Sequence, residues 1–150
     1  MDKVEQFFQV LAREMAVTLA TAAERRVSMR VVSPARYQDA ILIFTARDSL
    51  KYRQLQANPR CCIAAGFFFA EATAAFLGPT MRDENRALRE AYSAKFPDAF
   101  DKGVSFGGRD AEFILLRPTR LTGWAFASEA PAAGDVPTIP FEIALEAEAL

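Results

Sequence analysis

The sequence predicts a mainly β fold, a small antiparallel barrel of six to seven strands with helices at its rims. Short runs rich in β-forming residues recur along the chain, polar turn-like segments separate them, and two or three stretches show helical spacing. The chain has 150 residues, and 51% of them are hydrophobic. This length and composition are sufficient for one domain with a core of its own.

The first half of the chain begins with a helical pattern and continues with strand patterns. Apolar residues at helical spacing predict a helix over residues 2–13. Asp48 or Ser49 can cap a second helix that Asn58-Pro59 ends. Polar segments at 23–25 and 36–39 are the expected turns. The expected strands cover residues 15–22, 27–33 and 40–46.

The second half adds two strand pairs around another helix. The first pair is expected to turn near Ala70-Glu71, and the second to be joined around Pro118-Thr119. Between the pairs, Asp83 is the expected cap of a helix that stops at Pro97, and a glycine-rich loop follows at 103–108. The expected strands cover residues 60–69, 72–81, 112–117 and 120–127.

One uncharged stretch, residues 61–79, has the hydropathy of a membrane span. Its only charge, Glu71, lies in the middle, and no basic flank follows the stretch. We therefore interpret it as two buried strands and expect no membrane partner.

Charge is divided unevenly along the chain. All 18 Lys and Arg but only 14 of the 19 acids precede Ser128, so residues 1–127 carry +4 and residues 128–150 carry −5. We interpret residues 1–127 as the barrel domain and 128–150 as an acidic C-terminal tail. The tail's Ala/Pro/Glu-rich composition offers little core, although its end at 141–145 can dock as a short strand or helix. A mildly basic body suits a small anionic ligand better than nucleic acid, so no nucleic-acid partner is expected.

The sequence contains no histidine, which excludes several kinds of site. Ser-His-Asp and Cys-His catalysis, His-ligated zinc and His-ligated haem are all ruled out, and we expect no metal site. The two cysteines, Cys61 and Cys62, are adjacent, so on a strand they point to opposite faces and stay reduced. Reduced thiols, together with a charged N-terminus unlike a signal peptide, predict a cytoplasmic protein.

The best clue to function is a group of cations near the start of the second helix. Ser49 and Lys51 stand at its first turn, and Arg30 lies alone in a strand of apolar residues. A cation at a helix N-terminus faces the positive end of the helix dipole, which is unfavourable unless an anion binds there. These residues therefore predict a phosphate site and a phosphorylated cofactor.

Two motifs extend this prediction to a family. Ser28-Met29-Arg30-Val31-Val32, and Phe44-Thr45 followed by Ser49-Leu50-Lys51 and Asn58-Pro59-Arg60, resemble motifs of the pyridoxamine 5'-phosphate oxidase-like, FMN-binding split-barrel family. The resemblance covers about residues 15–126. It implies a split antiparallel β-barrel, FMN as cofactor, and a homodimer with flavin in the groove between subunits. The cofactor-binding positions that it implies are Arg30, Val31, Val32, Phe44, Thr45, Ser49, Leu50 and Lys51.

Departures from the family pattern narrow the expected activity. Leu50 replaces an arginine of the family's oxidases, and Thr73 stands about where they carry a glutamine. The tail lacks their Trp and Arg/His segment, which argues against pyridoxamine phosphate as substrate and places the chain nearer the small stress-protein-like and flavin-reductase-like members. We expect an FMN-dependent oxidoreductase with an unknown substrate and no nominated catalytic side chain. The alternatives are a non-catalytic flavin carrier or sensor, and a relative that binds deazaflavin F420.

Overall fold

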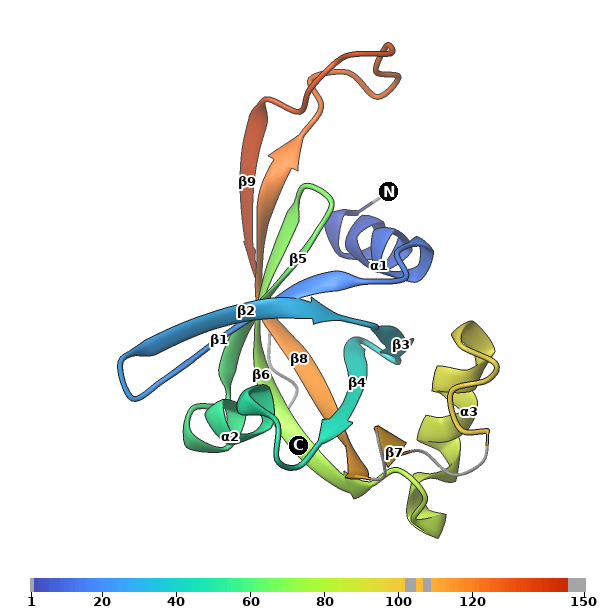
Figure 1. Cartoon of the computed structure of the whole chain (residues 1–150). Coiled ribbons are helices and arrows are strands. Elements are labelled where there is room, and N and C mark those ends of the chain that lie inside the picture. The colour runs from blue at the N-terminus through green and yellow to red at the C-terminus, as the bar shows by residue number, and fades with distance from the viewer. Residues whose placement is uncertain (1, 102–104, 107–108, 146–150) are drawn as a thin grey trace.

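The computed structural model describes residues 2–101, 105–106 and 109–145 as a twisted antiparallel sheet with flanking helices (Figure 1). Seven described strands follow one another in the order β2-β1-β5-β6-β8-β4-β3, and β7 and β9 pair with β8. The two ends of this order are not joined, so the sheet is a barrel that stays open. The strands are β1 (Val17–Ala23), β2 (Arg26–Val32), β3 (Ala35–Tyr37), β4 (Ala40–Ala46), β5 (Arg60–Ala65), β6 (Phe68–Pro79), β7 (Ser105–Phe106), β8 (Arg109–Ala125) and β9 (Ile139–Ala144). The helices are α1 (Lys3–Arg13), α2 (Leu50–Ala57), the 3-10 turn η1 (Asp83–Asn85) and α3 (Arg86–Lys95).

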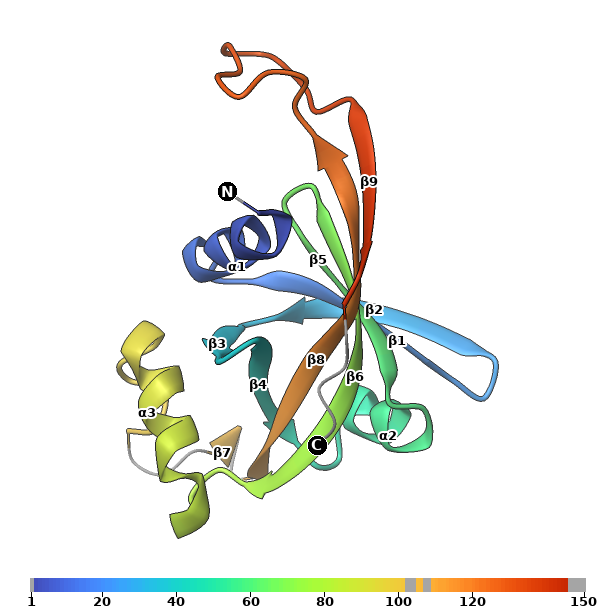
Figure 2. The same ribbon diagram turned by 180° about the vertical axis from the view of Figure 1, so that it is seen from behind.

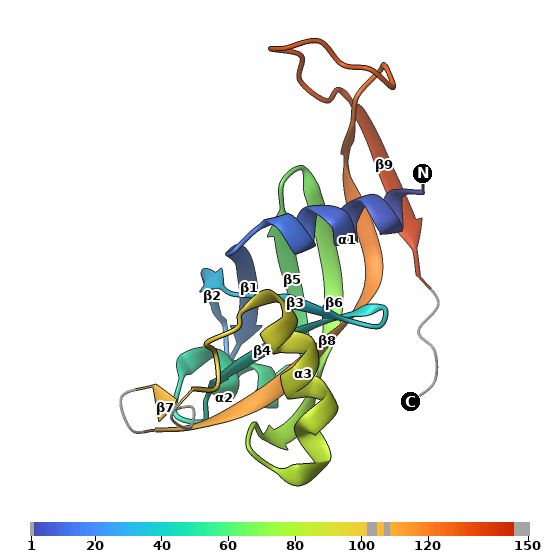
Figure 3. The ribbon, with the colours of Figure 1, turned by 90° about the vertical axis from the view of Figure 1, so that its right-hand side faces the viewer.

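The side chains of β8 point alternately to the two faces of the sheet, and they contribute to two separate hydrophobic clusters. Ile114 and Leu116 point into the barrel, where they join the face of α1 that carries Phe7, Phe8 and Leu11. Their neighbours on β8 point to the other face of the sheet, which α3 covers with Leu88 and Tyr92. The two helices therefore cover different faces of the strands and meet where the end of α3 contacts the end of α1 (Figures 2 and 3). Successive side chains of a strand point to opposite faces, so one strand supplies both clusters.

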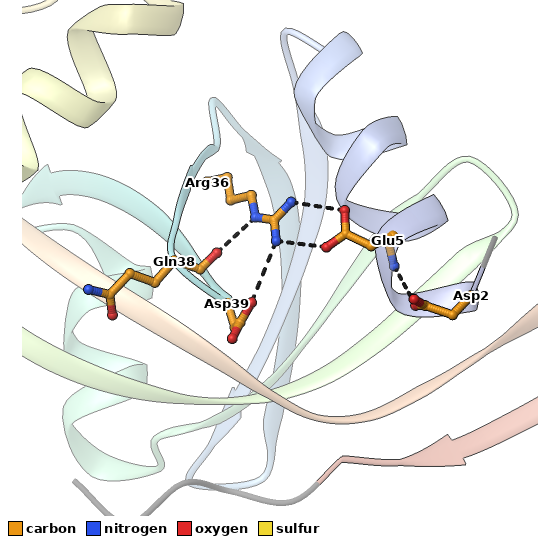
Figure 4. A network of polar contacts seen from close by, with 5 residues as sticks. All are labelled: Asp2, Glu5, Arg36, Gln38 and Asp39. Atoms are coloured by element: carbon orange, nitrogen blue, oxygen red, sulfur yellow. Dashed lines mark hydrogen bonds and ion pairs between the residues drawn. The ribbon is translucent and has the colours of Figure 1, made fainter.

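A polar network fastens α1 to the short strand β3 (Figure 4). Arg36 Nη2 and Nη1 donate to the two carboxylate oxygens of Glu5 at 3.0 and 3.3 Å, and Arg36 Nε donates to Gln38 O at 2.8 Å. The same guanidinium lies 4.3 Å from the centre of the Phe8 ring. Hydrogen bonding to Glu5 raises the pKa of Arg36. The segment 36–39, expected to be only a turn, thus begins as a strand and anchors the first helix.

The first strand pair turns earlier than expected. Its turn is at Gly66 and Phe67, not at Ala70-Glu71, so β5 is shorter and β6 longer than predicted. Gly66 has a φ of 58°, a conformation that side chains with a Cβ rarely adopt. The turn was predicted from the lone charge of Glu71 in an apolar stretch. Glu71 instead occupies an exposed position on a strand, where a charge is also tolerated.

The second strand pair is one continuous strand. Pro118 and Thr119 were expected to link two strands, but β8 runs through them from Arg109 to Ala125. The register against β6 shifts here, with Glu71 opposite Arg120 and Ala72 opposite Pro118. Proline cannot donate to the strand ladder and is tolerated at such a bulge. Asp83 also does not cap α3, because it lies in η1, and the expected glycine-rich loop falls largely outside the described residues.

Part of the acidic segment belongs to the sheet. Strand β9 pairs with Arg120–Ala125 of β8, and Phe141 and Leu145 pack against the barrel core. Docking of the 141–145 end as a strand is thereby confirmed, while the expectation of little core from this composition was wrong for these two side chains. No helix in the described ranges is long and apolar enough to cross a membrane.

Candidate functional site

The candidate site begins with Arg30 on β2, whose side chain points toward the barrel interior. Arg30 lies opposite Leu19 of β1, and its Nη1 donates to Leu19 O at 3.2 Å and to Thr21 Oγ1 at 2.7 Å. Its other terminal nitrogen, Nη2, donates to Gln54 Oε1 of α2 at 3.4 Å. Partial burial lowers the pKa of Arg30. These contacts hold the guanidinium between the β1–β2 hairpin and α2.

The N-terminus of α2 supplies the second part of the site. Ser49 caps the helix, with its Oγ accepting from Tyr52 N–H at 3.2 Å, so the predicted cap is confirmed. The hydroxyl of the buried Thr45 lies 3.1 Å from Ser49 Oγ. Serine at this position satisfies one of the backbone N–H groups that have no partner within the helix. The strand end and the helix cap therefore form one unit.

Lys51 lies in the first turn of α2 and is half-buried. Burial lowers the pKa of its ammonium group, and the nearby charge of Arg30 lowers it further. Among the described residues, no carboxylate forms an ion pair with Lys51 or with Arg30. Two neighbouring cations at a helix N-terminus form a site with a strong preference for an anion.

The other positions named from the sequence lie around this centre or away from it. Val32 is buried in the barrel core, whereas Val31 points outward and is 70% exposed. Phe44 packs on the α3 side, with its ring 4.9 Å from that of Tyr92. Leu50 is the half-buried first residue of α2. The structure therefore brings Arg30, Thr45, Ser49 and Lys51 to one region and turns the side chains of Val31 and Phe44 elsewhere.

Two buried polar residues that the sequence reading missed connect the parts of the site. Thr21 Oγ1 donates to Gln54 Oε1 at 2.5 Å, and both side chains are almost fully buried. Gln54 Nε2 donates to Arg26 O at 3.2 Å and approaches Ser28 Oγ at 3.4 Å. One signal was available: Gln54 follows Lys51 by three positions, so both lie on the same face of α2.

A buried carboxylate lies close to the same helix but is already neutralised. Glu112 Oε1 accepts from Tyr52 Oη at 3.1 Å, and Glu112 Oε2 pairs with Arg47 Nε at 2.8 Å. Burial and the charge of Glu112 raise the pKa of Tyr52. Because Arg47 balances Glu112, no carboxylate among the described residues is left to neutralise Arg30 and Lys51.

The two cysteines lie on opposite faces of β5, as expected. Cys61 is buried and Cys62 is half-buried, and both are free thiols. Burial raises the pKa of Cys61 to about 12, and burial together with Glu71 raises that of Cys62. Both thiols are therefore protonated near neutral pH and are poor nucleophiles.

Known proteins resemble this chain in structure and not in sequence. No family model matches the sequence, and a search of curated proteins finds no match. A putative pyridoxamine 5'-phosphate oxidase from Listeria innocua aligns with a TM-score of 0.64 at 14% identity, covering 80% of this chain and 96% of that one. A heme binding protein from Mycobacterium smegmatis aligns with a TM-score of 0.68 at 16% identity, covering 96% of this chain and 58% of that one.

A third similar structure is an FAD-binding protein from Mesorhizobium loti, with a TM-score of 0.60 at 14% identity, covering 81% of this chain and 92% of that one. At these identities the likeness establishes the fold. The open order of seven strands and the helices at the rims agree with these alignments in indicating one fold. The chain therefore has the split-barrel fold of the pyridoxamine 5'-phosphate oxidase-like proteins.

Proposed function

We propose that this protein binds FMN, with the phosphate group held by Arg30, Lys51 and the N-terminus of α2. The observation that carries the proposal is the pair of neighbouring cations, each with its pKa lowered, for which no described carboxylate serves as partner. Two like charges are costly to hold together in a half-buried place. A phosphate dianion removes that cost and accepts several hydrogen bonds.

The donors present fit a phosphate group. A guanidinium carries five N–H donors and an ammonium three, so Arg30 keeps donors beyond those given to Leu19, Thr21 and Gln54. Either hydroxyl of the Thr45–Ser49 pair can be the donor. When Thr45 donates, the Ser49 O–H is available to a phosphate oxygen. Charge-assisted bonds of this kind contribute about 1.5–3 kcal/mol each.

We further propose that the bound flavin serves an oxidoreductase whose substrate is unknown. Flavin supplies hydride and electron transfer, and the chain supplies binding and orientation. Two of the similar structures are described as a putative pyridoxamine 5'-phosphate oxidase and an FAD-binding protein, which supports a flavin. The third is described as heme-binding, but this chain has no histidine to serve as an axial ligand.

A homodimer completes the proposal, with the outward face of the β2-β1-β5-β6 sheet as its interface. Val27, Met29 and Val31 follow one another on the outer face of β2, and their exposed fractions are 80%, 75% and 70%. The same face continues through Ala20 and Cys62 to Phe69, which is 40% exposed, and it also carries the exposed Glu71 opposite Cys62. A row of large apolar side chains in water is typical of a surface that a partner covers.

The free thiols Cys61 and Cys62 agree with the proposed cytoplasmic location.

A fluorescence titration tests the proposed cofactor. The purified protein should quench FMN emission saturably. It should bind FMN more tightly than FAD or F420, and the Lys51→Met variant should bind FMN less tightly than the parent protein. Absence of saturable FMN binding would overturn the proposal. Anaerobic addition of NADH or NADPH then separates the two flavin functions: bleaching of the bound flavin supports an oxidoreductase, and no bleaching by either nucleotide supports a carrier or sensor.

A further inference from the structure

A cleft lies at the other end of the molecule from α2 and the proposed phosphate site. It is bounded by Lys3 and Gln6 of α1, Phe67 and Phe68 at the β5–β6 turn, and Trp124 and Phe126 at the end of β8. Figure 3 shows α1 lying across β5 and β6 with its N-terminal end near β9, and Figure 1 shows α2 at the opposite end. The volume of this cleft is about 560 Å³. Sites for small molecules usually measure roughly 300–1,000 Å³.

Three aromatic side chains form an aromatic wall in the cleft and are exposed to solvent. Phe67, Trp124 and Phe126 have exposed fractions of 52%, 46% and 38%. The Phe67 and Phe126 rings lie 6.4 Å apart and nearly perpendicular, at 83°. Aromatic rings gain free energy from contact with another ring, in stacked or edge-on geometry, beyond the area they bury. A planar aromatic ligand is therefore the occupant that this wall suits best.

The wall is held in place before any ligand binds. The backbone N–H of Trp124 donates to the backbone carbonyl of Phe67 at 3.2 Å. Gly123 allows this close approach, because a Cβ on Gly123 would lie 2.4 Å from Phe67 O. The neighbouring Phe68 ring is fixed between Phe7 and Phe141, at centroid distances of 6.2 and 5.7 Å. A preformed wall lowers the ordering cost of binding.

The charged groups that line the cleft are Lys3 and Glu129. Lys3 stands at the first position of α1, and its Nζ approaches Gln6 Oε1 at 3.4 Å and the Phe141 ring at 5.6 Å. An ammonium group has three donors, so Lys3 has donors left for a ligand. The carboxylates of Asp2 and Glu5 already lie at this end of the helix dipole, so the Lys3 ammonium itself is the group that would recognise a ligand anion. Glu129 comes from the loop after β8.

We propose that this cleft binds a planar aromatic compound that carries an anionic group, with the ring against Phe67, Trp124 and Phe126 and the anion at Lys3. Within one subunit this cleft is separate from the proposed phosphate site at Arg30 and Lys51. Trp124 is the only tryptophan of the chain, so it reports on the cleft directly.

The test uses 2-naphthoate as the probe and 2-naphthamide as its uncharged counterpart. In a ¹H–¹⁵N spectrum of the full chain, the single indole N–H resonance of Trp124 should shift saturably with 2-naphthoate. Calorimetric titration should show that the naphthoate binds about two- to fivefold more tightly than the amide, the range of an exposed ion pair. Lys3→Gln should remove this difference, and Glu129→Gln should enlarge it by taking away a like charge.

Arg13→Gln is the matched control, because Arg13 is an exposed cation at the other end of α1 and should leave both affinities unchanged. Two outcomes would overturn the proposal. One is the absence of a saturable shift of the Trp124 resonance with either probe. The other is a shift that follows protein concentration instead of probe, which would assign the cleft to a second copy of the chain.

Discussion

Arg30 of β2 and Lys51 of α2 are two cations brought together by the fold, and burial and then the charge of Arg30 lower the pKa of Lys51. Arg30 also has structural contacts, to Leu19, Thr21 and Gln54, whereas no hydrogen bond of Lys51 to a described residue is seen. We therefore expect Arg30 to serve both the fold and the proposed ligand, and Lys51 to serve the ligand alone.

Lys51→Met should weaken FMN binding without lowering the stability of the ligand-free protein. The variant removes one charge-assisted bond, about 1.5–3 kcal/mol, which corresponds to a loss of affinity of about tenfold or more. It also removes a cation that is unfavourable beside Arg30 and at a helix N-terminus. Flavin quenching and urea unfolding measure the two quantities. Arg53→Met, an exposed change on the same helix, is the control. A clearly destabilised Lys51→Met would show the lysine to be structural.

Gln54→Glu should abolish FMN binding while leaving the ligand-free protein folded. A carboxylate at this position would lie against Arg30 and close to Lys51, and so would take the place of the phosphate charge. It keeps an acceptor for Thr21 and Arg30, although it loses the donation from Nε2 to Arg26 O. Circular dichroism and flavin titration together test the variant. Undiminished FMN binding by a folded Gln54→Glu protein would place the phosphate elsewhere.

FMN affinity should depend on pH on both sides of neutrality. Below about pH 6 the phosphate monoester loses its second charge, and binding weakens. On the alkaline side, the pKa of Lys51 lies below 10.5 in the ligand-free protein and rises when an anion binds. Affinity is therefore complete while Lys51 is protonated and falls as pH rises through its lowered pKa. Titrations across this range should show an alkaline decline that Lys51→Met lacks, and an identical decline in the variant would refute the assignment.

The lowered pKa of Lys51 also affects unfolding. A lysine whose pKa is lower in the folded state binds fewer protons there than in the unfolded chain. Its unfavourable contribution is thus complete below the folded pKa and disappears as pH rises toward 10.5. Without ligand, the stability difference between Lys51→Met and the parent protein should shrink over this interval, as measured by urea unfolding.

Lys95→Met should destabilise the protein without changing the FMN affinity of the folded molecules. Lys95 Nζ donates to Leu11 O, Glu14 O and Pro34 O at 2.8, 2.6 and 2.7 Å, so it joins α3 to the end of α1 and to the connection after β2. A cation also suits the C-terminal end of α1. Loss of these bonds should cost at least about 1.5–3 kcal/mol. Thermal unfolding beside the exposed control Arg86→Met measures the effect, and equal stability of the two variants would contradict this role.

The features that the sequence determined by itself depend on residues close together in the chain. Ser49 as the cap of α2, the helical face of α1 and the opposite directions of Cys61 and Cys62 all follow from local backbone geometry. The resemblance of the motifs around Arg30 and Lys51 was enough to name the fold. The sequence also indicated that a cation at the start of α2 calls for an anion, because the helix dipole acts within a single turn.

Tertiary structure alone decided what depends on residues far apart. The turn at Gly66 and the passage of β8 through Pro118 follow from register against neighbouring strands, which no local pattern encodes. Gln54 meets Thr21 and Arg30 only because α2 packs on the β1–β2 hairpin. The aromatic cleft likewise arises where the end of β8 meets the β5–β6 turn and α1. Local preference sets the conformation of each segment, whereas burial of the shared core selects which segments meet, and that selection places the functional side chains together.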